Sequence, residues 1–188
     1  MSNFHFANTA AQVPGNGTPP AEFSIKAPSS TDIWSKPPTH QSSTAQSRSR
    51  LSNEPASPSP HPGNTNTTRG GLIIVLHTAD GDKKWVKAGI ELTHGKPHLS
   101  AVAKDRFADW SLLPVPSGGG AATLEMVKEE DGSLWVYLIE GVSKAPIREV
   151  TWVFEEEGVK ECWVGVYAAR PGDVGGELEV NFGHLIVE

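Results

Sequence analysis

Six side chains that could bind a ligand lie within residues 84–111, which read KWVKAGIELTHGKPHLSAVAKDRFADWS. They are Trp85, Lys87, Glu91, His98, Asp109 and Trp110. The alternation of the stretch predicts two strands joined by a tight turn at His94-Gly95, followed by a loop and a short strand. Because successive side chains of a strand point to opposite faces, Trp85, Lys87 and Glu91 share one face. We expect this face to be either a binding surface or a solvated sheet face.

Hydrolysis of a glycoside would need two carboxyl groups that flank the scissile bond. Glu91 and Asp109 could meet across neighbouring strands, but Lys87 on the same face would pair with Glu91. The contiguous acids at 155–157 would point to alternate sides of a strand, and Gly158 beside them indicates a turn. We therefore predict no catalytic residues.

Binding of a carbohydrate would use flat aromatic rings beside carboxylates. Trp135 and Tyr137 share one side of a later strand and could add to a platform formed by Trp85 and Trp110. The competing interpretation is simple packing, since a tryptophan in a β-sandwich is usually buried. A carbohydrate or a protein partner is the expected ligand of this face.

Metal binding and nucleophilic catalysis have weaker signals. His94 and His98 lie four residues apart, but only His98 is on an expected strand, so three converging zinc ligands are not indicated. Cys162 alternates with Val164 and Val166, which predicts a small core residue. We expect no metal and no cofactor.

Composition excludes other classes of function. The net charge is −6 and no strong cluster of Lys and Arg occurs, so nucleic-acid binding is not expected. No apolar run approaches the roughly 20 residues of a membrane-spanning helix. A single cysteine fits a reducing compartment, and we expect a cytoplasmic protein without membrane or nucleic-acid partners.

Short alternating segments bounded by Gly, Pro and Asp fill the second part of the chain. No window of a dozen residues has the 3.6-residue period of a helix. The pattern predicts an all-β fold, an antiparallel sandwich or barrel. The expected strands are 72–78, 84–93, 98–104, 109–113, 122–129, 133–141, 148–155, 161–169 and 177–188, with a further short strand at EFSIK near the N-terminus.

The segments WVKAGIE, GKPHLS and DWS, followed later by REVTWVF and CWVGVYAARP, resemble the DUF1349 family, which includes a fungal "regulation of enolase" protein. The resemblance covers residues 72–188, and EFSIKAPSSTDIWSKPP is similar to the N-terminal strand region of the family. It implies a jelly-roll sandwich of the concanavalin A-like lectin and glucanase superfamily, without established catalytic residues. It also implies a binding or regulatory role, linked by name to a metabolic enzyme such as enolase.

Four regions follow from these patterns: a disordered tail at 1–21, the N-terminal strand region of the sandwich at 22–38, a low-complexity and disordered segment at 39–70, and the main sandwich at 71–188. Members of the family carry a strand, an aromatic-rich turn and a YDQGG-like motif where this chain has LSNEPASPSPHPGNTNTTRGG. Back-translated and read two nucleotides on, this segment allows FQRARVTFSAPWKYQYDQGG. We therefore interpret 39–70 as an out-of-frame segment that leaves the N-terminal part of the sandwich incomplete; the alternative is a natural linker.

Overall fold

The computed structural model describes residues 20–37, 68–155, 158–172 and 176–188. Within these ranges the chain forms ten β-strands and no helix. Their bounds are β1 (Glu22–Ala27), β2 (Thr68–Thr78), β3 (Lys83–Thr93), β4 (Lys96–Lys104), β5 (Ala108–Pro114), β6 (Thr123–Lys128), β7 (Leu134–Glu140), β8 (Ser143–Val150), β9 (Val159–Ala169) and β10 (Leu178–Gly183).

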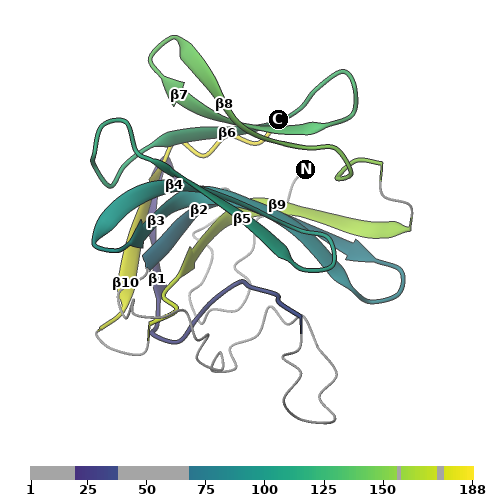
Figure 1. The fold of residues 1–188 in the computed structure, drawn as a ribbon, viewed down its shortest axis with the longest axis horizontal. Helices are drawn as coiled ribbons and strands as arrows, with labels where there is room; N and C mark the ends of the chain where they lie inside the picture. The colour runs from purple at the N-terminus through teal and green to yellow at the C-terminus, as the bar shows by residue number, and fades with distance from the viewer. Residues whose placement is uncertain (1–19, 38–67, 156–157, 173–175) are drawn as a thin grey trace.

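A five-stranded antiparallel sheet forms the centre of the molecule, in the order β5-β4-β3-β2-β9. One face, which we call the core face, carries Ile74, Val86 and Ala101. These side chains pack against Leu134 and Val136 of a second sheet, in the order β6-β7-β8. The two sheets lie one above the other in Figure 1. The alternation of apolar and polar residues thus buries one side of each sheet in a shared core.

A third, two-stranded sheet pairs β1 with β10, which are far apart in the sequence. It lies against the end of β2, because a Cβ atom added at Gly70 would come within 2.6 Å of Val180.

The chain after β1 crosses the opposite face of the five-stranded sheet, which we call the strap face. Residues 28–35 form this strap, and Figure 1 shows them running along the side of the sheet that faces away from β6, β7 and β8. One end is fixed at β9, where Thr31 N donates to Arg170 O, and the other at β5, where Ala108 N donates to Ser35 O. Ile33 and Trp34 pack onto the apolar residues of the strap face.

The predicted all-β antiparallel sandwich is confirmed, and the predicted turn at His94-Gly95 has positive φ at both residues, as a tight hairpin requires. The strand predicted at 148–155 was wrong in position. β8 instead runs from Ser143 to Val150 after a turn at Gly141, and residues 151–155 form turns. Pro146 can lie within β8 because β8 is the edge strand of its sheet, where a residue without a backbone N–H donor is tolerated.

Two further expectations need correction. β2 begins at Thr68, so the sandwich starts before the predicted boundary at residue 71, and residues 68–70 belong to a regular ladder with β3 and β9. Cys162 is exposed rather than a core residue, because it lies on edge strand β9. Most of the segment 39–70, including its predicted disorder, lies outside the described residues, as does most of the predicted tail at 1–21. A search of the described residues finds no helix long and apolar enough to cross a membrane.

Candidate functional site

The strap face carries cross-strand rows of side chains, which the register of the ladders defines. One row contains Lys87 between Ile73 and Val102, and another pairs Arg69 with Glu91. The row between them holds Gly71 opposite Gly89, so no side chain fills its centre. The row of Arg69 and Glu91 is therefore separated from the row of Lys87 by a row that has no side chain on β2 or β3.

Four ionisable side chains and a serine form a polar cluster in this place: Asp32, Arg69, Lys87, Glu91 and Ser100. Arg69 Nη1 donates to both oxygens of Asp32, at 3.0 and 3.1 Å. Lys87 Nζ lies 3.8 Å from Asp32 Oδ1. Ser100 Oγ donates to Glu91 Oε1 at 2.9 Å and accepts from Trp110 Nε1 at 3.1 Å. The cluster holds two cations and two anions, so its charges balance.

Burial of this cluster is nearly complete. The side chains of Lys87 and Glu91 are 0% exposed and that of Arg69 is 5% exposed. Removing charges from water costs several kcal/mol for each ion unless hydrogen bonds and opposite charges compensate. The core face of the same sheet is buried by apolar side chains. The sandwich therefore does not need the buried charges of the polar cluster in order to form.

Compensation inside the cluster is incomplete. Three of its buried polar atoms have no hydrogen-bond partner among the described residues: Arg69 Nε, Lys87 Nζ and Glu91 Oε2. The buried hydroxyl of Tyr167, on the same sheet face, also lacks one. Arg69 Nε lies 3.3 Å from Glu91 Oε2, but the two atoms lack hydrogen-bond geometry. Buried polar groups in native proteins nearly always have partners, and each exception calls for an explanation. An absent ligand is one such explanation.

Aromatic rings enclose the two cations. The Lys87 ammonium lies 5.2 Å from the ring centre of Tyr167, 5.5 Å from that of Trp85 and 5.9 Å from that of Trp34. The Arg69 guanidinium lies 5.5 Å from the ring of Trp110. These contacts stabilise the charged forms in part. Burial nevertheless lowers the pKa of Lys87 to about 8, with Asp32 opposing the shift and Arg69 adding to it. Burial also raises the pKa of Tyr167, so its hydroxyl stays a hydrogen-bond donor.

The structure brings four of the six predicted site residues together. Trp85, Lys87, Glu91 and Trp110 all belong to the strap face. The expectation of a solvated sheet face is wrong there, because the strap covers it and Lys87 and Glu91 are fully buried. His98 is paired with Glu91 in the ladder, but its Nδ1 lies 3.0 Å from Lys96 O, so its ring is engaged within the turn.

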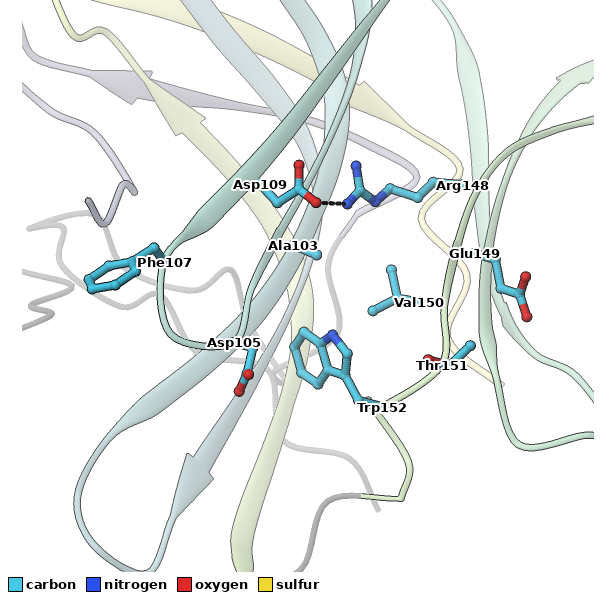
Figure 2. A pocket seen from close by; sticks show the side chains of 9 residues that line it. All are labelled: Ala103, Asp105, Phe107, Asp109, Arg148, Glu149, Val150, Thr151 and Trp152. Atoms are coloured by element: carbon cyan, nitrogen blue, oxygen red, sulfur yellow. Dashed lines mark hydrogen bonds and ion pairs between the residues drawn. The ribbon is translucent and has the colours of Figure 1, made fainter. Parts of the chain in front are cut away.

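Asp109 is the residue that the structure places elsewhere. It is opposite Ala103, on the core-face side of β5, and its Oδ2 accepts from Arg148 Nη2 of β8 at 2.8 Å. The pair borders a hollow of about 230 Å³ between the edges of the two sheets, shown in Figure 2, with Asp105, Phe107 and Trp152 among its lining residues. Asp109 therefore bridges the sheets and does not contribute to the polar cluster.

Four members of the site were not predicted from the sequence: Asp32, Arg69, Ser100 and Tyr167. Asp32 lies in the strap, which has no periodic pattern, and Arg69 is next to the low-complexity segment. Tyr167 alternates with Trp163 on β9, and that aromatic spacing could have placed it on the same face. Among the described residues, no three His, Cys, Asp or Glu side chains are arranged to hold a metal ion.

Fold and site together define an antiparallel β-sandwich with a charged cluster buried beneath an N-terminal strap. The chain belongs to the family described as "Protein of unknown function (DUF1349)", which matches residues 15–188. It is 56% identical over 199 residues to the uncharacterized protein AN7484 of Emericella nidulans, an alignment that covers 100% of this chain and 96% of the relative. A functionally unknown protein from Saccharomyces cerevisiae has a similar structure, with a TM-score of 0.55 and 20% identity over 87% of this chain and 85% of that one. At this identity the similarity shows the fold alone.

Proposed function

We propose that this protein is a non-enzymatic binding protein and that the strap face is its binding site. The observation that carries the proposal is that Arg69 Nε, Lys87 Nζ, Glu91 Oε2 and the Tyr167 hydroxyl are buried together on one sheet face without a hydrogen-bond partner among the described residues. A cluster that served only to hold the strap would be expected to satisfy these groups internally, because each unmade hydrogen bond costs about 1–3 kcal/mol. A bound molecule that supplies the missing partners accounts for them.

The arrangement of the carboxylates disfavours catalysis. A glycosidase needs one carboxyl group that carries a proton and a second that acts as base or nucleophile. Asp32 accepts from Arg69 through both oxygens, and Glu91 accepts from Ser100 and lies beside the same guanidinium. Both carboxyl groups are thus engaged by Arg69 or Ser100 beneath the strap, which favours binding over hydrolysis.

A screen of small molecules tests the proposal. The full chain is mixed with sugars, sugar acids, amino acids, organic acids and nucleotides, and its melting temperature is measured beside that of the Lys87→Met variant. We expect at least one compound that stabilises the wild type and fails to stabilise Lys87→Met. Compounds that stabilise both proteins equally, or no stabilising compound at all, would contradict a site on the strap face.

Carbohydrate binding at a different place is the second candidate, and one observation favours it. The rings of Trp135 and Tyr137 lie half-buried on the outer face of the second sheet, stacked with centres 5.8 Å apart and 18° between their planes. Two nearly parallel aromatic rings offer flat apolar surfaces of the kind on which sugars can stack. A glycan array would report this activity, and a hit lost in Trp135→Ala but kept in Lys87→Met would assign it to the outer face.

The resemblance to the fungal "regulation of enolase" protein adds a partner to the proposal, namely a metabolic enzyme such as enolase. It also adds a cytoplasmic location and membership of the concanavalin A-like superfamily. The chain's net charge of −6 gives no reason to expect nucleic acid instead. Enolase activity measured with increasing amounts of the purified protein tests this partner. A rate that stays constant up to a large molar excess would rule enolase out.

A further inference from the structure

We infer that the ligand of the strap face carries a carboxylate, and that the Asp32 side chain occupies its place when the strap is closed. This inference rests on the proposed function, because it names the class of ligand for the same site. It follows from the kinds of atoms left unpartnered, the charge of the sheet without the strap, and the way Asp32 is bound.

The unpartnered atoms are mostly donors. Arg69 Nε, Lys87 Nζ and the Tyr167 hydroxyl can each donate a hydrogen bond, whereas only Glu91 Oε2 accepts. A ligand that satisfies this set must be rich in acceptors. A carboxylate has two acceptor oxygens with about four lone-pair positions and no donor.

The charge of the sheet leads to the same class. Without Asp32, the charged members of the polar cluster are Arg69, Lys87 and Glu91, which together carry one net positive charge. Asp32 brings one negative charge and neutralises the cluster. A ligand with a single negative charge would do the same, and a phosphate with up to two charges would overcompensate.

Asp32 itself is an imperfect occupant. Its two oxygens accept from the same nitrogen, Arg69 Nη1, so the paired donors of the guanidinium are not used together. Its Oδ1 is 3.8 Å from Lys87 Nζ, beyond hydrogen-bond distance. A free carboxylate is not limited by the backbone of the strap. It could bind two nitrogens of Arg69 side by side, which is the strong geometry for this pair.

The strap is attached in a way that allows exchange. Its backbone hydrogen bonds to the sheet lie at its ends, at Ser30, Thr31 and Ser35, and none is found between Asp32 and Trp34 in the described part of the chain. Its centre is held by the packing of Ile33 and Trp34 and by the Asp32 contacts. If the strap lifts, Trp85, Trp110 and Tyr167 remain as flat walls beside the two cations, which suits a carboxylate on a ring, such as a uronic acid.

Isothermal titration calorimetry on the full chain tests the inference. The probes are D-glucuronate, which has a ring and a carboxylate, D-glucose, which has the ring alone, acetate, which has the carboxylate alone, and inorganic phosphate. In Asp32→Asn the internal competitor loses its charge, so we expect glucuronate to bind about tenfold more tightly than in the wild type. The gain should vanish in the double variant Asp32→Asn/Arg69→Gln, and glucose should show no gain.

Two further variants complete the design. Asp109→Asn removes a carboxylate that pairs with Arg148 outside the cluster, and it should leave the affinity for glucuronate unchanged. Thr31→Val removes a hydroxyl that bonds Pro28 O and Arg170 N at one end of the strap, so it loosens the strap but keeps Asp32. It should also raise the affinity for glucuronate, and it provides the test if Asp32→Asn does not fold.

The outcomes separate the two claims. Tighter binding of acetate and glucuronate in Asp32→Asn supports a carboxylate site, and a larger gain for glucuronate assigns the ring to the aromatic walls. The inference is overturned, while the binding site stands, if a neutral compound or phosphate binds at Lys87 and neither Asp32→Asn nor Thr31→Val tightens the binding of a carboxylate. If Lys87→Met changes the binding of no compound, the proposed function fails as well.

Discussion

At the level of one residue, Lys87 shows how the site lowers the stability of the fold. Burial holds its pKa at about 8, below the ordinary value of 10.5. Its ammonium has aromatic rings on three sides, but no hydrogen-bond acceptor within reach among the described residues. A residue in this state lowers stability, and such residues are often found at functional sites.

The stability of the wild type should therefore rise with pH relative to Lys87→Met. Between pH 8 and 10.5 the unfolded chain keeps the proton on Lys87 while the folded chain has released it, so rising pH favours the folded state. The shift corresponds to roughly 3 kcal/mol, since each pKa unit is worth about 1.36 kcal/mol. Urea denaturation of both proteins at intervals across this range measures the difference. If the free energy of unfolding changes with pH in the same way for both proteins, Lys87 is not buried as a cation.

Glu91 should be costly to neutralise. Glu91→Gln leaves Arg69 and Lys87 with only Asp32 as a counter-charge, and a buried charge without a partner typically costs about 3–5 kcal/mol. The matched control is Glu179→Gln, because Glu179 is on β10 and accepts from Ser24 in an exposed position. The control should change the free energy of unfolding by less than about 0.5 kcal/mol. Equal effects of the two substitutions would mean that the polar cluster is hydrated.

At the level of elements, the close approach of β2 and β3 depends on glycine. A Cβ atom added at Gly89 would come within 2.0 Å of Gly70 O, and one added at Gly71 within 2.0 Å of Ala88 O. No side chain can be accommodated there without separating the strands that carry Arg69 and Glu91.

Gly89→Ala should accordingly destabilise the protein by about 3 kcal/mol or more, because overpacking would force the backbone apart. Gly165→Ala on neighbouring β9 is the control, since a Cβ atom there would meet no atom within 4 Å. Thermal denaturation of the two variants compares them directly. A Gly89→Ala protein that melts with the wild type would refute the tight spacing of β2 and β3.

Sequence patterns could predict the sheet faces but not what covers them. The alternation of Trp85, Lys87 and Glu91 against Val86, Ala88 and Ile90 correctly separated the strap face from the core face. Whether the charged face meets water depends on residues 28–35, which carry no period and whose contacts with the sheet are distant in sequence. Asp109 was misplaced because its face depends on the register of β5, and the loop before that strand does not reveal this register.

At the level of the whole molecule, the two main sheets are unequal. Five strands face three, and β9 at the edge of the larger sheet leaves Val164 50% exposed and Cys162 exposed on its core-face side. Exposed apolar residues on a strand that is otherwise part of a sandwich support the hypothesis that neighbouring strands are lacking. The candidate source is the part of the segment 39–70 that precedes β2, which would supply a strand and an aromatic-rich turn in another reading frame.

Sequencing the transcript across codons 36 to 72 tests this hypothesis. We expect a splice variant or frame that encodes a YDQGG-like motif before the strand at 72–78. The corresponding protein should be more stable and less prone to aggregate than the chain described here, because an open sheet edge would be paired. A clean frame with the present codons, and no shifted transcript, would establish 39–70 as a natural linker.

The central claim is that the strap face binds a carboxylate in the place that Asp32 occupies. A crystal structure of the Asp32→Asn variant grown with D-glucuronate tests it most directly. The account predicts a carboxylate that contacts Arg69 and Lys87, with the ring against Trp85 or Trp110 and the strap displaced. Glucuronate bound only at Trp135 and Tyr137, or a closed strap over an empty cluster, would contradict it.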